Sequence, residues 1–193
     1  AAGAAPSGDN IQPWRFCWDG KSLLVLGDRV RGSVFYDVEY ESMLVALGAS
    51  MENISLAAGK QGFAIKWQMM ESLGDEQVAA KGDFSKCAGC GDELFHQVRR
   101  RHTNRYAYCR TVLSAQQKAL ISEEAKKVKG AEIVWVDNPA ALNACVFANY
   151  SADKILFENA LLHRDLFSWI EGARGREIDS EGMSYQVLGL SAL

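Results

Sequence analysis

The segment Ala5-Pro6-Ser7-Gly8-Asp9-Asn10-Ile11-Gln12-Pro13-Trp14-Arg15-Phe16 holds two of the chain's three prolines. Each proline fixes its own φ at about −65° and removes a backbone donor, and it biases the residue before it, Ala5 or Gln12, towards extended backbone. The polar side chains between the prolines can bond to the backbone or to a ligand. The pattern predicts a rigid polar turn that enters a strand at Trp14, and it leaves open which of these partners the polar groups serve.

Length and composition indicate one domain of ordinary size with a hydrophobic core, since the chain has 193 residues, 48% hydrophobic and 23% charged. A net charge of −3 gives no electrostatic reason to expect nucleic acid or an anionic membrane as a partner. No apolar run approaches the roughly 20 residues that span a bilayer. The first residues lack the features of a signal peptide, and residues 1–5 resemble the end of a helix whose beginning is absent.

Five cysteines are present, and an odd number in a chain of this length does not indicate a disulfide framework. We therefore expect a reducing, cytoplasmic setting. The turn Cys87-Ala88-Gly89-Cys90 is compatible with half of a zinc site or with a redox pair. Structural zinc takes four ligands, and no second C-x-x-C or H-x-x-x-H pair is present. The sequence therefore predicts two unpaired thiols in a loop and no metal site.

Hydrophobic periodicity predicts a β–β–α–β–β block over residues 14–84. Strands at 14–18 and 22–26 flank Asp19-Gly20, a strong two-residue hairpin signal. A long helix opens at Asp37 or Glu39 and stops at Gly59 and Gly62. Its apolar positions follow the 3.6-residue period: Tyr40, Met43, Leu44, Leu47, Met51, Ile54 and Ala58.

Two further strands, at 63–70 and 78–84, are predicted to pair across Leu73-Gly74-Asp75. Beyond them the pattern predicts a short helix over 92–100 and a second helix over 114–127 with Ser114 as its N-cap. A short strand at 132–136 follows. A long helical region then runs from Asn138-Pro139 to about residue 171.

The run Arg99-Arg100-Arg101-His102-Thr103-Asn104-Arg105-Tyr106 is the strongest local concentration of positive charge. One interpretation is a solvated basic helix end, favoured by the helix dipole. The other is a phosphate clamp, because alternate residues of an extended segment share one side. That side would present Arg101, Thr103 and Arg105, and the planar guanidinium fork matches phosphate oxygens. A hydroxyl between two guanidinium groups suits a terminal phosphate monoester.

Both motifs resemble those of the nitroreductase-like flavoproteins. Seven positions match the family signature P-S-x-x-N-x-Q-P-W-x-F: Pro6, Ser7, Asn10, Gln12, Pro13, Trp14 and Phe16. Residues 101–105 resemble the R-x-[ST]-x-R segment by which the family holds the phosphate of FMN. The resemblance implies FMN as cofactor, with Pro6, Ser7, Asn10 and Gln12 beside the flavin ring and Arg101, Thr103 and Arg105 on the phosphate.

The long predicted helix also resembles the family's central helix, where a polar residue often faces the cofactor. Asn53 stands at the matching position, and an Asn satisfied by its own helix neighbours is an equally open interpretation. The order of the motifs departs from that of ordinary nitroreductases, in which the phosphate segment precedes the turn. It resembles relatives that carry two copies of the fold in one chain as a pseudo-dimer.

The resemblance implies an α+β, nitroreductase-like fold with an antiparallel or mixed sheet packed with helices around a long central helix. Residues 1–98 would form a first half without its N-terminal helix, and residues 99–193 the start of an incomplete, helical second half. The two motifs would meet either within one chain or across a homodimer.

The activity implied is that of an FMN-dependent oxidoreductase that passes hydride from NADH or NADPH to a nitro, quinone or similar small-molecule acceptor. No residue is assigned as a catalytic acid or base. Two alternatives remain open. One is a non-catalytic protein that binds or sequesters flavin, and the other is an incomplete half-domain that acquires a site only by dimerising.

Overall fold

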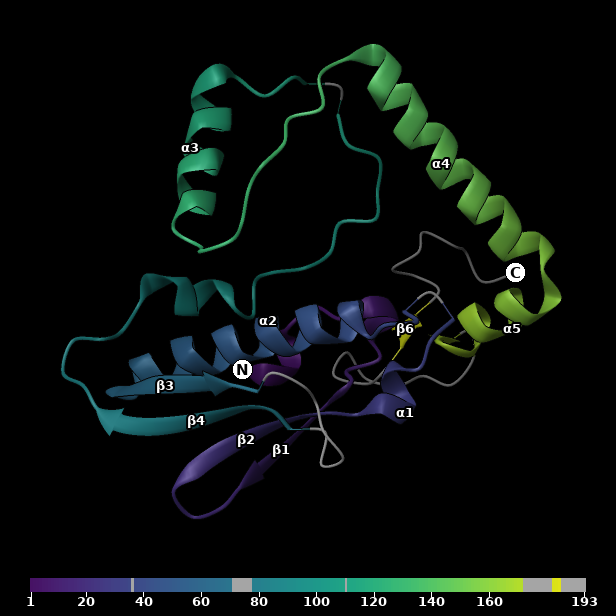
Figure 1. Cartoon of the computed structure of the whole chain (residues 1–193). Helices are drawn as coiled ribbons and strands as arrows, with labels where there is room; N and C mark the ends of the chain where they lie inside the picture. The colour runs from purple at the N-terminus through teal and green to yellow at the C-terminus, as the bar shows by residue number, and fades with distance from the viewer. Residues whose placement is uncertain (36, 71–77, 110, 172–181, 185–193) are drawn as a thin grey trace. The chain divides into compact units, whose positions relative to one another are not determined.

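The computed structural model describes residues 1–35, 37–70, 78–109, 111–171 and 182–184 (Figure 1). Its elements are η1 (Ala2–Ala4), η2 (Gly8–Asn10), β1 (Trp14–Trp18), β2 (Ser22–Gly27), α1 (Arg29–Gly32), α2 (Glu41–Lys60), β3 (Phe63–Met69), β4 (Val78–Lys86), η3 (Glu93–Gln97), α3 (Ala115–Lys126), α4 (Pro139–Glu158), α5 (Ala160–Ser168), β5 (Ile170–Glu171) and β6 (Met183–Ser184). The chain is therefore of the α+β class, as predicted.

The chain divides into two compact units. Unit 1 comprises Ala1–Arg105 together with Arg164–Leu193, and unit 2 comprises Tyr106–His163. The functional division predicted between residues 98 and 99 stays a prediction. None of the described helices combines the length and the apolar character needed to cross a membrane.

Unit 1 contains a four-stranded antiparallel sheet in the order β1-β2-β4-β3 (Figure 1). The predicted pairing of β1 with β2 is confirmed, and so is that of β3 with β4. The structure adds the pairing of β2 with β4, which joins the two hairpins into one sheet. The predicted turn at Leu73-Gly74-Asp75 lies outside the described residues.

The β1–β2 loop differs from the predicted two-residue turn. Trp18 lies opposite Leu23, and the backbone N of Asp19 donates to the carbonyl of Ser22 at 3.2 Å, so the chain reverses at Gly20-Lys21, one residue later than predicted. The Oδ1 atom of Asp19 accepts hydrogen bonds from the backbone N of Ser22 at 2.6 Å and of Lys21 at 2.9 Å. These two donors, that of Ser22 foremost, hold the pKa of Asp19 below its usual range. The aspartate side chain therefore organises the loop by bonding to backbone N–H groups, as Asp commonly does in turns.

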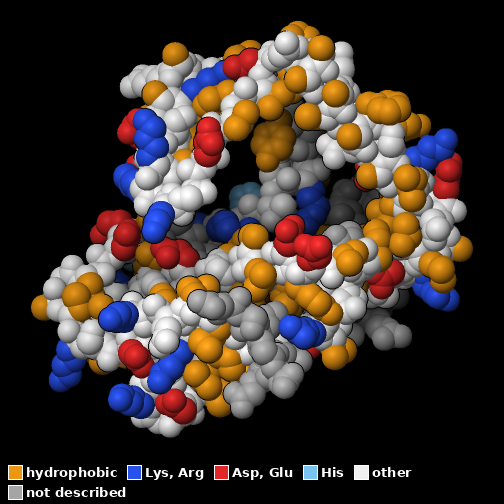
Figure 2. All heavy atoms as spheres, in the orientation of Figure 1, with side chains coloured by type: hydrophobic (Ala, Val, Ile, Leu, Met, Phe, Trp, Pro, Cys, Tyr) orange, Lys and Arg blue, Asp and Glu red, His pale blue; other side chains and the backbone are white. Residues whose placement is uncertain are grey.

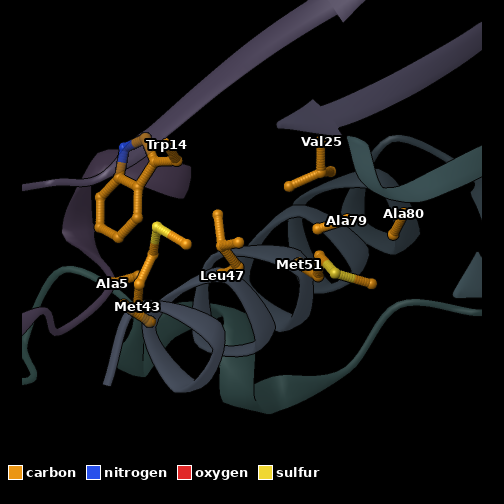
Figure 3. Close-up of a cluster of buried hydrophobic side chains, with 9 residues drawn as sticks. Ala5, Trp14, Val25, Met43, Leu47, Met51, Ala79 and Ala80 are labelled. Atoms are coloured by element: carbon orange, nitrogen blue, oxygen red, sulfur yellow. The ribbon is translucent and has the colours of Figure 1, made fainter. Parts of the chain in front are cut away.

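The core lies between the sheet and α2, which packs on it through a stripe at three- and four-residue spacing: Met43, Ala46, Leu47, Ser50 and Met51. Figure 3 shows Met43 facing Trp14 of β1 and Leu47 beside it on the same side of the helix. Small residues complete the cluster: Ala5, Ala79 and Ala80. Leu44, predicted on the apolar stripe, lies instead on the exposed side.

The start of α2 is also later than either predicted position, since the helix begins at Glu41. Asp37 is buried, and its two carboxylate oxygens accept hydrogen bonds from the backbone N of Ser42 and of Met43, both at 2.9 Å. The carboxylate thereby satisfies N–H groups that have no partner within the first turn of a helix.

In unit 2, the helices expected at 114–127 and from Pro139 onward are confirmed as α3 and α4. Ser114 forms a capping box with Gln117, and the side chain of Asn138 accepts from the first N–H groups of α4. The strand predicted at 132–136 is wrong, because the segment forms no regular structure. A strand needs a neighbour to bond its backbone. Here Trp135 instead donates from Nε1 to Ser122 Oγ of α3 at 3.2 Å.

Two other helical predictions are corrected. The region from Pro139 to about residue 171 is interrupted at Asn159, whose ψ of 115° leaves the helix. Its Oδ1 then caps α5 by accepting from the backbone N of Leu161 and Leu162. The helix predicted over 92–100 is a 3-10 helix over Glu93–Gln97 only, with Asp92 accepting from Leu94 N at 2.7 Å.

Candidate cofactor site

The polar turn before β1 has an unusual backbone. Asp9, Asn10 and Gln12 have φ values of 46°, 55° and 50°, in the left-handed region that non-glycine residues rarely adopt. The prediction of extended backbone is confirmed for Ala5, and it is wrong for Gln12. Gln12 is held otherwise because its N donates to Ser7 Oγ at 3.1 Å while its carbonyl accepts from Trp14 N at 2.8 Å. Strained backbone of this kind clusters at functional sites.

A second segment of unit 1 lies against this turn. Asn10 donates from Nδ2 to the carbonyl of Gly182 at 2.9 Å, and Gly182 N donates to the carbonyl of Asn10 at 3.1 Å. The next residue, Met183, is buried, and its N donates to the carbonyl of Trp169 at 2.7 Å. The turn is therefore joined by reciprocal hydrogen bonds to Gly182, the residue immediately before β6.

The arginine segment reaches the same region of unit 1. Arg101 donates from Nη2 to the carbonyl of Ala4 at 3.3 Å, although the two residues are 97 positions apart. From Nη1 it reaches Thr103 Oγ1 at 3.4 Å, which sets a guanidinium group beside a hydroxyl. Arg105 places Nη2 at 3.1 Å from the sulfur of Met183. The predicted phosphate segment therefore contacts Ala4, just before the turn, and Met183, the neighbour of the Gly182 that bonds to the turn.

These contacts suit an anionic ligand. Residues 101–105 lack regular structure and are exposed, as an accessible clamp requires. Arg101 interacts with a neutral carbonyl, and Arg105 with a thioether sulfur, which is a weak acceptor. A phosphate group would offer both cations a stronger, charge-assisted partner. The donor set therefore fits an anionic group such as a phosphate.

The remaining predicted site residues are placed less directly. Pro6 is exposed, whereas Ser7, Asn10 and Gln12 are half-buried. Asn53, on α2, donates from Nδ2 to the carbonyl of Ala1 at 3.3 Å. Asn53 and Arg101 therefore both bond to the N-terminal segment, Asn53 at Ala1 and Arg101 at Ala4.

The structure adds contacts that the sequence did not indicate. Arg31 of α1 places Nη1 at 3.3 Å from the carbonyl of Gln12, and Gly182 and Met183 join the turn to Arg105. No motif or period marks these residues, because their proximity depends on the folding of distant parts of unit 1.

A scan against protein-family models finds no match for this chain, and a search of the curated proteins finds no similar protein either. The resemblance to nitroreductase-like flavoproteins therefore rests on the sequence motifs alone.

Proposed function

We propose that this chain is a nitroreductase-like, FMN-dependent oxidoreductase that takes hydride from NADH or NADPH and delivers it to a nitro, quinone or similar acceptor. The observation that carries the proposal is the hydrogen bond from Arg101 to Ala4. It brings the phosphate-type segment to Ala4, two residues before Pro6 of the P-S-x-x-N turn, within one compact unit.

In this proposal the residues of unit 1 divide into two groups. Arg101, Thr103 and Arg105 bind the phosphate through two guanidinium groups and a hydroxyl. The turn, with Pro6, Ser7, Asn10 and Gln12, lies at the ring, and Asn53 supports the same side through the N-terminal segment. Bound FMN would supply the acceptance and donation of hydride.

The turn's role is positioning rather than acid–base chemistry. Ser7 Oγ accepts from Gln12 N. The side-chain amide and the backbone carbonyl of Asn10 both bond to the backbone of Gly182, which holds the peptide at Asn10 fixed. A turn that is held by these hydrogen bonds presents backbone atoms at constant positions, which is what a preorganised cofactor site needs.

The first test is the visible spectrum of the purified protein after incubation with FMN and removal of excess flavin. We expect retained flavin that is bleached by NADH or NADPH under anaerobic conditions. Protein that retains no flavin would contradict the proposal. Retained flavin that neither nicotinamide bleaches would overturn the oxidoreductase assignment and indicate a flavin-binding protein.

The second test is the double variant Arg101→Ala/Arg105→Ala, with Arg99→Ala/Arg100→Ala as the matched control because it removes the same charge from the same run. A hydrogen bond to a charged group contributes about 1.5–3 kcal/mol, so losing two weakens FMN binding on the order of a hundredfold or more. Flavin fluorescence titration measures the Kd. Equal affinities in the two double variants would show that the clamp is assigned to the wrong arginines.

A further inference from the structure

The pair Cys87 and Cys90 lies outside the candidate cofactor site, in the turn that follows β4. The turn has Ala88 and Gly89 at its centre, and Gly89 has a φ of 78°. That value is typical of the third residue of a type II turn, whose first and fourth Cα atoms lie within about 7 Å of each other. A disulfide spans Cα separations of about 4.4–6.8 Å. The backbone of the turn therefore suits a disulfide between its first and fourth residues.

The side chain of Cys90 is also directed towards Cys87. The sulfur of Cys90 lies 3.0 Å from the carbonyl oxygen of Cys87, which places it back over the turn. The neighbouring Cys87 side chain is the main cause that raises the pKa of the Cys90 thiol. Both cysteines are free and half-buried, with Ala88 and Gly89 exposed between them. A small disulfide molecule can therefore approach the pair from solvent.

The turn is firmly attached at both ends. Cys87 N donates to the carbonyl of Gly62 at 2.9 Å, and the carbonyl oxygen of Cys90 lies so close to Gly59 that a Cβ there would be 2.5 Å away. Fixed ends keep the two sulfurs near each other, and this proximity favours an internal disulfide over two separate mixed disulfides.

We propose that Cys87 and Cys90 form a dithiol–disulfide redox site that exchanges with low-molecular-weight disulfides such as oxidised glutathione. The thiolate of Cys87 attacks the glutathione disulfide, forms a mixed disulfide and releases one glutathione thiolate. Cys90 then loses its proton to solvent, and its sulfur attacks the sulfur of Cys87 and releases the second glutathione. The two protein thiols are oxidised by two electrons, and the glutathione disulfide is reduced to two thiols. This proposal is independent of flavin binding.

Trypsin separates the cysteines for the test. Cleavage after Lys86 and Arg99 gives the peptide 87–99, which contains both members of the pair, whereas Cys17, Cys109 and Cys145 fall in peptides 16–21, 106–110 and 130–154. The full chain is equilibrated with mixtures of reduced and oxidised glutathione, quenched in acid, alkylated, digested and analysed by mass spectrometry. We expect peptide 87–99 to lose two hydrogen atoms and both alkylation sites, while the other three peptides carry glutathione or an alkyl group.

Single variants assign the order of the steps. In Cys90→Ser the reaction should stop at a glutathione adduct on Cys87, and in Cys87→Ser the adduct on Cys90 should form several-fold more slowly. Two glutathione adducts on peptide 87–99 of the wild type would overturn the proposal, as would a reduced pair when Cys109 is fully glutathionylated. Stoichiometric zinc that is lost in Cys87→Ser/Cys90→Ser would likewise overturn it, because the pair would then be a metal half-site.

Discussion

The carboxylate of Asp37 stabilises the longest helix of unit 1 from a position outside it. The side chain is 6% exposed, and its two oxygens each accept one backbone hydrogen bond at 2.9 Å, from Ser42 and Met43. Met43 is itself one of the most deeply buried core residues, so the cap also fixes where the core stripe begins. A negative charge at this end of a helix is favourable because of the helix dipole.

We predict that Asp37→Ala lowers the free energy of unfolding by about 2 kcal/mol, since it removes a cap with two charge-assisted hydrogen bonds. Urea denaturation followed by circular dichroism measures this change. Glu39→Ala is the control, because Glu39 is exposed, and it should leave the unfolding midpoint where it is. If both variants unfolded at the wild-type midpoint, the cap would not contribute to stability as described.

The left-handed backbone at Asp9, Asn10 and Gln12 is a second feature at this scale. Residues in sparsely populated backbone regions cost on the order of 1–3 kcal/mol each and persist where surrounding contacts hold them. The contacts here come from Ser7, Arg31 and Gly182, which are distributed over three segments of unit 1. A strained turn that is held by contacts from three segments suits the positioning role proposed for it.

At the scale of elements, α2 carries two glycines in contrasting environments. A Cβ at Gly48 would meet nothing within 4 Å, and the residue is exposed. A Cβ at Gly59 would lie 2.5 Å from the carbonyl oxygen of Cys90, a backbone atom that cannot move without displacing the turn. The same helix therefore needs one glycine for packing and does not need the other.

We predict opposite effects for the same substitution at the two positions. Gly48→Ala should raise the free energy of unfolding by roughly 0.5–1 kcal/mol, because alanine has the higher helix propensity. Gly59→Ala should lower it by on the order of 1–3 kcal/mol, because the methyl group overpacks against the turn. Chemical denaturation of the two variants side by side is the measurement. A stabilising Gly59→Ala would show that the turn at Cys90 does not pack on the helix.

The elements could be predicted from the sequence where local chemistry decides them. Alternation located β1 and β3, an apolar run after a hairpin signal located β2, and the turn residues after β3 indicated β4 as its partner. The cap residues Ser114 and Asn138 located the starts of α3 and α4. The segment 132–136 shows the limit, because an apolar run becomes a strand only if another strand lies beside it. Asn159 shows a second limit. The hydrophobic pattern would continue the helix through this residue, but its side chain bonds to the backbone N–H groups of Leu161 and Leu162 and a new helix begins there.

At the scale of the whole molecule, the contacts that build the candidate site could not be predicted from the sequence. The motifs indicated Ser7, Asn10, Arg101 and Arg105 as candidates, because a residue type at a given spacing has a chemistry of its own. The bonds from Asn10 to Gly182 and from Arg105 to Met183 depend on how residues after 163 return to unit 1. The spacing of residues along the chain does not indicate that residues this distant in sequence pack together.

Unit 2 has a face of large apolar side chains on α4. No residue of α3 or α4 is buried, although the large apolar side chains Leu142, Val146, Tyr150 and Phe157 recur at four- and seven-residue spacing on one face of α4. Val146 and Tyr150 are each 65% exposed. Figure 2 shows hydrophobic side chains gathered along this helix. Helices in proteins take most of their stability from packing of an apolar face, and such a face marks an interaction site.

We predict that two copies of the chain associate through this face of α4, because a two-fold interface buries the same apolar patch on both copies. The double variant Val146→Asp/Tyr150→Asp should sediment as a monomer at concentrations where the wild type sediments as a dimer. Ala144→Asp/Ala148→Asp, which adds the same charge to the opposite side of α4, is the matched control and should remain dimeric. Sedimentation velocity over a wide range of loading concentrations is the measurement. The prediction would be contradicted if the wild type stayed monomeric throughout. It would also be contradicted if the control dissociated as readily as the Val146 and Tyr150 variant, and this face would then bind a different partner.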